Sequence, residues 1–557
     1  MFKKVQLISK KSFLKINYCH YLCNIKTKSF YIVEQFHIST LDLTVIGAYL
    51  LFIIWWGLKN GKSEDSQSYF LAGRSMPWWI VGLSLFAASI SSTTLIGQSG
   101  DAYHTGLAVF NYNLTGIIVM IFFAVCILPL YLKSKIFTIP EFLEKRFDKR
   151  SRYYFSAICI IGNIFLDAAG ALYAAALIIK LIMPEADLQL IIIIFAIIAA
   201  SYTIPGGLSS AINAEIIQAA ILILGSIMLT TLCFMQGGEY FTNLFANNDL
   251  SLKLIRPLFD NATPWLGLIV GMPITGLYFW ANNQTLVQRV LSAKNIEEGR
   301  KGVIFTGFLT MLTLVIIAIP GVIARHLFPG LEKPDMVYPN MVLNLMPIGL
   351  LGVMLAALLS ALTSTLSAIL NSTSTLFTID FYAQFNKKAS SKKLVIVGKI
   401  ASCVIIILAA LWAPFIGHFG SLLKYYQEML SYIAPPIVGA FLLGIFTKRT
   451  NANGAFVGLI VGLIIAVLLL FFKNAIFGDL HFLYIVPILL ILSLIVMWAV
   501  SLSGSRPDNE KLITTTFHYK DLKSEIISAY HSNWLSSYLF WAMILLVLSA
   551  FVWIVFS

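Results

Sequence analysis

Hydroxyl side chains are concentrated in one apolar stretch, TSTLSAILNSTSTLF at 363–377. In this stretch and just before it, polar residues recur at spacings of four, three, four and three: Ser360, Ser364, Ser367, Asn371 and Ser374. This spacing places them on one face of a helix. Hydroxyls in an apolar helix either pack between helices and bond to the carbonyl of the preceding turn, or bind a hard cation such as Na⁺. The density of this face favours a ligand role for some of its members.

A second group of hydroxyls lies far upstream, in LFAASISSTTLIGQSGDAY at 85–103. A uniform helix facing lipid would gain nothing from so many hydroxyls and glycines. A helix broken in mid-membrane exposes backbone carbonyls, and it is tolerated where it is buried in protein or lines a cavity. Carbonyls from such breaks and two hydroxyls from another helix would together hold Na⁺ with neutral oxygens.

Ionisable residues also fall within or at the ends of apolar segments: Asp167, Glu215, Lys424 and Glu428. Each costs at least ~2.5 kcal/mol at the centre of a membrane helix, so a functional role is the default interpretation. Lys424 and Glu428 could instead form an i, i+4 pair near a helix start. Asp167 lies mid-segment in NIFLDAAGALY, which favours function. Coupling to protons through Asp167 or Glu215 is therefore an alternative to sodium.

The composition indicates a membrane protein. Of the 557 residues, 58% are hydrophobic and 12% are charged, whereas soluble domains carry roughly 25% charged residues. Repeated apolar runs of about twenty residues predict an all-α polytopic fold with about fourteen transmembrane helices in a single domain over 39–557. Residues 1–38 show no signal-peptide pattern and are interpreted as a disordered tail or a mis-assigned start. The segments are expected at 40–58, 77–100, 106–132, 152–183, 188–204, 211–236, 263–290, 302–327, 340–382, 394–415, 423–446, 453–472, 481–503 and 535–556.

The net charge of +13 is explained by topology. Loops after odd-numbered segments carry most of the loop Lys and Arg, such as the run between 133 and 150, which predicts that both chain ends lie outside. No nucleic acid needs to be invoked, and no obligate protein partner is evident. No His is placed to complete a catalytic constellation at membrane depth, so we expect a transporter rather than an enzyme. A membrane sensor or receptor on the same scaffold is a remote alternative, since such sensors are usually fused to a signalling domain.

Several motifs resemble the sodium:solute symporter family, specifically its sodium/glucose cotransporter branch, over about 40–556. They are YFLAGRSMPWW, FTIPEFLEKRFDKRSR, YTIPGGLSSAINAEIIQ, QTLVQRVLSAKN, LNSTSTLFTIDFY and FLLGIFTKRTNANGAFVG. The resemblance implies a five-plus-five inverted repeat of the LeuT type, with repeats at approximately 77–236 and 263–446. It also implies sodium-coupled import of a small organic solute by alternating access, across the plasma membrane, which in a bacterium is the inner membrane.

The resemblance also implies a sodium site. The matching positions are the carbonyls of Ala87, Ile90 and Ala361 and the hydroxyls of Ser364 and Thr365. Some members of the family bind a second sodium, and the matching positions for it are Glu215, Ser364 and Ser367. The next position is Ala368 where a hydroxyl is expected, and this departure puts the second site in question.

The implied substrate pocket departs from that of the sugar transporters. Their polar sugar ligands are replaced by Thr94, Asn113, Gly276 and Thr310, and only Gln427 is kept. Ser89 and Ser91, with Thr94 and Asn113, resemble the pocket of the family's sialic acid transporters. Those transporters use an Arg where this chain has Leu166, and Asp167 beside it argues against an anionic substrate unless it is protonated. Aromatic gates match Tyr112 and Phe279. We therefore expect a sugar, amino sugar, polyol or related compound.

Overall fold

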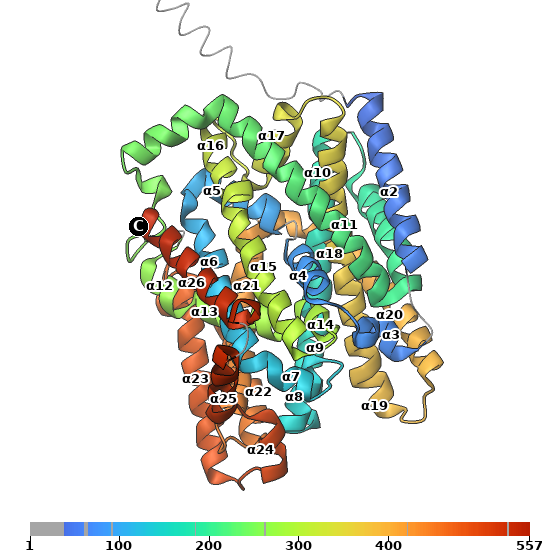
Figure 1. Ribbon diagram of the computed structural model, residues 1–557, viewed down its shortest axis with the longest axis vertical. Coiled ribbons are helices and arrows are strands. Elements are labelled where there is room, and N and C mark those ends of the chain that lie inside the picture. Colours follow the sequence, from blue (N-terminus) through green and yellow to red (C-terminus); the bar gives the residue numbers. More distant parts are fainter. Residues whose placement is uncertain are drawn as a thin grey trace, which may run out of the picture.

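The computed structural model describes residues 38–60, 65–90, 93–183, 185–260, 263–419, 422–531 and 534–557. Apart from two isolated β-bridges, the secondary structure of these residues is helical. Figure 1 shows the helices packed side by side in one bundle. The expected all-α fold is confirmed. The tail at 1–37 and Ser91 lie outside the described residues.

Eleven helical stretches in the described part of the chain are long and apolar enough to cross a membrane. They are Thr40–Lys59, Leu107–Lys133, Lys149–Lys180, Leu188–Ala246, Ile296–Leu327, Leu350–Phe385, Ser391–Gly417, Lys424–Phe446, Ala452–Phe477, Phe482–Ser503 and Tyr538–Val555. The pair Trp78–Ser89 and Thr94–Thr105, which is bent by 62°, makes a twelfth if the two helices are counted as one broken span.

Helix α11 (Leu188–Ala246) contains two of the expected segments. Its 59 residues would reach about 90 Å if straight, three times the ~30 Å hydrocarbon core of a bilayer. At Gly207 the backbone leaves helical geometry with φ 62° and ψ −155°. The Ser210 hydroxyl donates to the Tyr202 carbonyl at 3.2 Å, although a straight helix separates residues eight apart by about 12 Å. The chain therefore folds back at Gly207.

The first helix of each expected repeat is interrupted. In the first, α4 (Trp78–Ser89) ends before Ile90, whose ψ of 78° is not helical, and the chain continues through η2 (Thr93–Gly97) into α5 (Gln98–Thr105). In the second, α12 (Trp265–Val270) and α13 (Met272–Leu277) lead into the π-helical η7 (Tyr278–Asn282). Asn283 is then extended before α14 (Gln284–Leu291). Both breaks expose backbone groups inside the bundle.

Matching π-helical stretches occur in the next two spans of each half. They are η4 (Phe123–Ile127) and η8 (Leu314–Ala318) in one pair, and η5 (Asn163–Ala168) and η10 (Leu376–Tyr382) in the other. In the first pair, a proline lies two residues after the end of each stretch: Pro129 after η4 and Pro320 after η8. Such bulges are rare and are frequent at functional sites. Their recurrence fits an internal repeat, whose boundaries at 77–236 and 263–446 stay a prediction.

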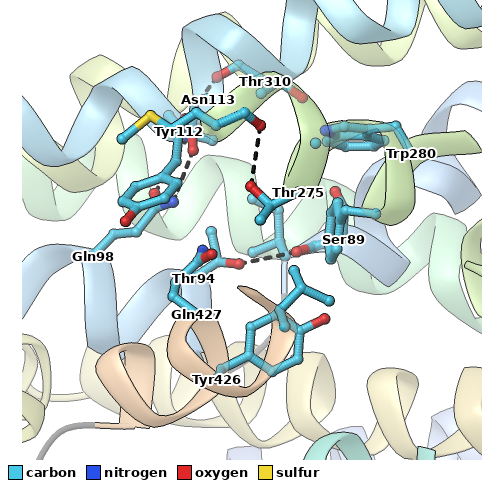
Figure 2. Close-up of a pocket in the computed structure, with 16 residues that line it drawn as sticks. Ser89, Thr94, Gln98, Tyr112, Asn113, Thr275, Trp280, Thr310, Tyr426 and Gln427 are labelled. Carbon is cyan, nitrogen blue, oxygen red and sulfur yellow. Dashed lines mark hydrogen bonds between the residues drawn. The ribbon is translucent and has the colours of Figure 1, made fainter. Parts of the chain in front are cut away.

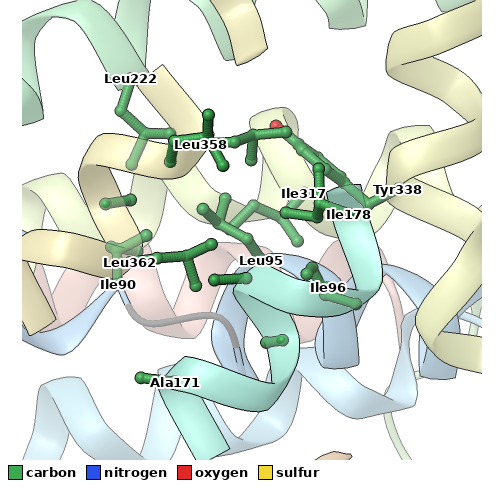
Figure 3. Packing of buried hydrophobic residues seen from close by; sticks show 14 of the residues in the cluster. Ile90, Leu95, Ile96, Ala171, Ile178, Leu222, Ile317, Tyr338, Leu358 and Leu362 are labelled. Carbon is green, nitrogen blue, oxygen red and sulfur yellow. The ribbon is translucent and has the colours of Figure 1, made fainter. Parts of the chain in front are cut away.

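Helix α18 (Leu350–Thr375) carries the hydroxyl face and lies in the middle of the bundle, packed against α2 (Thr40–Asn60), α4, α11 and α20 (Ser391–Trp412). The expected segment 340–382 is divided: α17 (Val337–Leu345) ends before Met346, which is extended, and Gly349 has φ 85°. Figure 3 shows apolar side chains on either side of the first break, including Ile90 and Leu95, packed beside Leu362 of α18. This packing holds the break against the hydroxyl helix.

The remaining elements complete the bundle and its connections. The longer ones are α6 (Asn111–Phe122), α8 (Ile139–Arg146), α9 (Lys149–Gly162), α10 (Ala169–Ile182), α15 (Ile296–Thr313), α16 (Ile319–Leu327), α21 (Leu422–Phe446), α22 (Ala452–Phe477), α23 (Phe482–Ser503), α25 (Tyr519–His531) and α26 (Tyr538–Val555). The short ones are α3 (Ser66–Leu71), α7 (Leu128–Lys133), α19 (Ala383–Phe385), α24 (Asn509–Thr515), and the 3₁₀ turns η1 (Ala72–Arg74), η3 (Leu107–Phe110), η6 (Leu250–Leu252), η9 (Pro334–Met336), η11 (Ala413–Phe419) and η12 (Trp534–Ser536).

Candidate ion and solute site

A cleft of about 730 Å³ lies where the two broken helices meet α6, α15 and α21 (Figure 2). We call it the central pocket. Its lining residues are Ser89, Ile90, Thr94, Gln98, Tyr112, Asn113, Met272, Thr275, Gly276, Phe279, Trp280, Thr310, Thr313, Tyr426, Gln427 and Leu430. Hydroxyls, amides and aromatic rings dominate, and the described residues of the lining include no Asp, Glu, Lys, Arg or His. The pocket can therefore hydrogen-bond many polar groups without supplying a charge.

Most residues expected in the substrate pocket line this cleft. They are Ser89, Thr94, Asn113, Gly276, Thr310 and Gln427, together with the expected gates Tyr112 and Phe279. Asp167 lines a neighbouring cavity instead, and Ser91 is not described. The roles of these residues stay predictions, because lining a cleft does not by itself assign a contact with solute.

Five lining residues with a hydrogen-bonding side chain were not expected from the sequence: Gln98, Thr275, Trp280, Thr313 and Tyr426. Three of them had a local signal. Gln98 lies in the hydroxyl-rich stretch 85–103, Thr313 follows Thr310 by one turn, and Tyr426 precedes Gln427. Thr275 and Trp280 had none, because the path of the broken second helix decides which of its residues face the cleft.

A chain of hydrogen bonds fixes one wall of the central pocket. The Gln98 amide donates to Asn113 Oδ1 at 2.7 Å, and Asn113 Nδ2 donates to Thr313 Oγ1 at 2.5 Å. Thr313 Oγ1 in turn donates to the Thr310 carbonyl at 2.6 Å. The Thr310 hydroxyl is buried and has no hydrogen-bond partner among the described residues. A buried polar atom of this kind is costly unless a ligand or water satisfies it.

At the first break the polar groups bond to backbone. The Thr94 hydroxyl donates to the Ser89 carbonyl at 3.0 Å (Figure 2), and the Ser89 hydroxyl donates to the Phe86 carbonyl at 2.8 Å. These bonds hold the end of α4 and the start of the next helical segment in one arrangement. The same break therefore shapes both the central pocket and the expected sodium site.

The expected sodium ligands of α18 converge on one point. The hydroxyls of Ser364 and Thr365 donate to the Ala361 carbonyl at 2.8 and 3.0 Å, so three of the five expected ligand oxygens lie together. Ala87 and Ile90 are buried at the end of α4, which packs on α18. The last carbonyls of a helix have no partner within that helix. All five expected ligands are neutral oxygens, which fits a hard monovalent cation.

The residues expected for a second sodium site already have protein partners. Glu215 Oε1 accepts from Arg289 Nη2 at 2.7 Å, and both side chains are 0% exposed. The other oxygen of Glu215 accepts from the Ser84 hydroxyl. Ser367 Oγ accepts from the Thr203 hydroxyl at 2.7 Å. Arg289 supplies the Glu215 carboxylate with a fixed counter-charge, so a second sodium would have to compete with it.

A second, smaller cavity of about 370 Å³ adjoins the central pocket. We call it the Asp167 cavity. It is lined by Ala88, Ser89, Asp167, Phe279, Asn283, Thr285, Leu286, Thr365, Ile369 and Tyr426. Asp167 accepts a hydrogen bond from the Tyr426 hydroxyl. It lies in η5, which is tied to α18 by the Asn163 amide donating to Thr373 Oγ1 at 2.9 Å.

Comparison with known proteins gives concordant matches. The model of the sodium:solute symporter family matches residues 69–462. Sodium/glucose cotransporter 1 of Ovis aries is 34% identical over 520 residues, covering 83% of this chain and 78% of that protein. Sodium/myo-inositol cotransporter 2 of Bos taurus is 32% identical over 530 residues, covering 86% of this chain and 78% of that protein.

Two solved structures share the fold. The substrate-bound, outward-open structure of a Na⁺-coupled sialic acid symporter aligns with a TM-score of 0.76 at 24% identity, covering 84% of this chain and 99% of that chain. The nucleobase-cation-symport-1 transporter Mhp1, in a closed conformation, aligns with a TM-score of 0.54 at 14% identity, covering 81% and 98%. These alignments confirm the expected LeuT-type fold.

Proposed function

We propose that this chain, which belongs to the sodium:solute symporter family, imports a solute that carries several hydroxyl groups and no acidic group. The chain is a multi-pass, sodium-coupled solute symporter and not an enzyme, as its family and relatives establish. Within that activity, the proposed substrates are sugars, amino sugars and polyols. The observation that carries the proposal is the lining of the central pocket, which is rich in hydroxyls and amides and, among the described residues, has no charged side chain.

The chemistry of the pocket supports this substrate class. A site built to hydrogen-bond hydroxyls gains affinity from each paired group and rejects compounds that leave its groups unpaired. Gln427 and the Thr310 hydroxyl, which has no protein partner among the described residues, provide such groups. The ring of Trp280 offers an apolar face for the C–H side of a sugar or inositol. An acid would find no cation here and would lie close to the carboxylate of Asp167.

The shared break explains how sodium and solute could be coupled. Sodium held by Ala87, Ile90, Ala361, Ser364 and Thr365 would bridge the end of α4 to α18. Ser89 and Thr94, on either side of the same break, line the central pocket. Sodium would thus order the solute-binding groups, and it shifts the conformational equilibrium only through its different affinity for the two states. Rocking of the bundle then exposes both sites to the cytoplasm.

Proton coupling in the same fold is the competing mechanism. Asp167 is the better candidate for it, because Glu215 has Arg289 as a counter-charge while Asp167 faces a cavity. Solute transport in sodium-free buffer at low pH would support this alternative.

We further propose that the protein acts in the plasma membrane, which in a bacterium is the inner membrane. An inward sodium gradient across that membrane would drive import. The lipid bilayer is then the environment in which the protein acts.

The test is the thermal stability of the purified protein with a library of sugars, amino sugars, polyols and sugar acids, in sodium and in potassium at equal ionic strength. We expect a polyhydroxylated compound to raise the unfolding temperature in sodium and not in potassium. The substrate proposal is wrong if sugar acids alone stabilise the protein. Equal stabilisation in both salts would instead point to proton coupling through Asp167.

A further inference from the structure

We propose that the Asp167 cavity is a subsite for a monovalent cationic group, next to the expected sodium site at Ala361, Ser364 and Thr365 and sharing Thr365 with it. The group is either the protonated amine of a transported amino sugar or a second inorganic cation. This inference rests on the proposed function, since it assigns a charge to one of the ligands of the same transport cycle.

The first observation is a carboxylate without a counter-charge. Asp167 lies in the middle of the span Lys149–Lys180. Among the described residues its partner is the Tyr426 hydroxyl, and no ion pair is formed. The other intramembrane acid on α11, Glu215, has both an arginine and a hydroxyl. An acidic group at membrane depth without a basic partner is expensive, and such groups mark ion and proton pathways.

The second observation is the donor set of the cavity. Besides Asp167, five of its lining residues have a side-chain oxygen: Ser89, Asn283, Thr285, Thr365 and Tyr426. Oxygen donors together with one carboxylate suit a hard monovalent cation or an ammonium group. The part of the cavity lining that the structure describes includes no Lys, Arg or His that would prefer an anion.

The third observation is the connection to the other two sites. Ser89, Phe279 and Tyr426 line both the Asp167 cavity and the central pocket. In the view of Figure 2, Tyr426 lies below Ser89 among the residues that line the central pocket. Thr365 belongs both to this cavity and to the expected sodium ligands. A solute in the central pocket could therefore extend an amine past Tyr426 toward Asp167.

The size of the cavity fits either occupant. Within its roughly 370 Å³ of space between atoms, a water-sized sphere can be centred in about 40 Å³, and one water needs about 10–15 Å³ on that measure. The space suits a cation with one or two waters, or an ammonium group still attached to a solute.

The experiment first compares the wild type with Asp167→Asn in the absence of solute. Thermal stability is measured against sodium chloride and methylammonium chloride, with choline chloride keeping the ionic strength constant. Asp101→Asn serves as the matched control, because Asp101 is another intramembrane carboxylate but lines neither cavity. We expect one of the two cations to raise the unfolding temperature of the wild type and of the control. The apparent affinity of Asp167→Asn for that cation should be at least about 10-fold lower than that of the wild type, because hydrogen bonds to charged groups contribute about 1.5–3 kcal/mol.

Solute then distinguishes the two occupants. For a substrate amine, the wild type prefers glucosamine over glucose, and Asp167→Asn lowers that ratio of affinities by about 10-fold. For an inorganic cation, the ratio is unchanged, and Asp167→Asn lowers the Hill coefficient for sodium from about 2 to about 1.

Two outcomes overturn the inference. One is that the wild type and Asp167→Asn are stabilised equally by the cations and also show the same preference for glucosamine over glucose. The other is an effect of Asp167→Asn on the pH dependence alone, which would make Asp167 a proton site. If no polyhydroxylated solute binds the wild type, the proposed function fails, and the cation measurements without solute still decide the subsite.

Discussion

Two buried carboxylates of this symporter lie in contrasting surroundings. Glu215 belongs to a network that we call closed because Arg289 and Ser84 occupy both oxygens of its carboxylate, although Arg289 Nε has no partner among the described residues. Asp167 belongs to an open lining, in which polar atoms face a cavity of about 370 Å³. The two regions adjoin, because Arg289 Nη1 donates to the carbonyl of Thr285, which lines the Asp167 cavity. Polar residues in this membrane domain therefore serve two purposes that their residue types do not distinguish.

The difference has an energetic consequence. Removing one member of a closed, buried network leaves its partner unpaired, and the cost falls on stability. Removing a member of an open lining leaves the apo protein almost as stable, and the cost falls on the bound ligand. Substitutions can therefore show whether a residue belongs to the closed network or to the open lining.

The largest effect is expected for Arg289→Met. It leaves the carboxylate of Glu215 buried without a counter-charge, which should lower the free energy of unfolding by about 3–5 kcal/mol. The measurement is SDS-induced unfolding in mixed micelles. The double variant Arg289→Met/Glu215→Gln is the control, and it should recover most of the loss because it removes both charges. If the double variant is less stable than the single one, Glu215 is not stabilised by Arg289 and the network is not closed.

An intermediate effect is expected for Thr365→Ala. The variant loses one of five expected sodium ligands, so the sodium concentration for half-maximal transport should rise about 10-fold, equivalent to about 1.4 kcal/mol. Thr363→Ala is the matched control on the same helix. Its hydroxyl also bonds back one turn, to the Ser360 carbonyl at 3.0 Å, but it lines neither cavity. Equal sodium dependence in Thr365→Ala and Thr363→Ala would remove Thr365 from the sodium site.

The sequence predicted much of the fold because its signals are local. The periodic face from Ser360 to Ser374 predicted the central helix, and the hydroxyl and glycine content of 85–103 predicted a break, observed after Ser89. The predicted helix boundaries were less accurate where the conformation of a single residue decides where a helix ends. The fold-back of α11 depends on the positive φ of Gly207, and the separation of α17 from α18 depends on the turn around Gly349.

The candidate site was predicted only in part, because it is assembled from five separate parts of the chain. The pairing of Glu215 with Arg289 joins positions 74 apart, and no local pattern indicates it. Residue type marked Asp167 and Glu215 equally as buried acids. Their different surroundings depend on which helices pack beside them, and the sequence of either segment does not contain that information.

The smallest effect, and the sharpest test of the open lining, is expected for Thr310→Val. The Thr310 hydroxyl has no partner among the described residues, so replacing it with a methyl group of similar shape should not lower the free energy of unfolding by more than about 0.5 kcal/mol, and it raises that free energy if no water pairs with the hydroxyl. Solute affinity should fall about 3- to 10-fold, because one neutral hydrogen bond contributes about 0.5–1.5 kcal/mol.

Thr313→Val is the control for this prediction, since its hydroxyl accepts from Asn113 and donates to the Thr310 carbonyl. It should lower the free energy of unfolding by about 1–3 kcal/mol, because Asn113 Nδ2 loses the hydroxyl oxygen to which it donates a hydrogen bond. Isothermal titration and SDS-induced unfolding measure the two quantities separately. If Thr310→Val lost as much stability as Thr313→Val, the Thr310 hydroxyl would be bonded within the protein, and that wall of the pocket would belong to the closed network rather than to the surface that meets the solute.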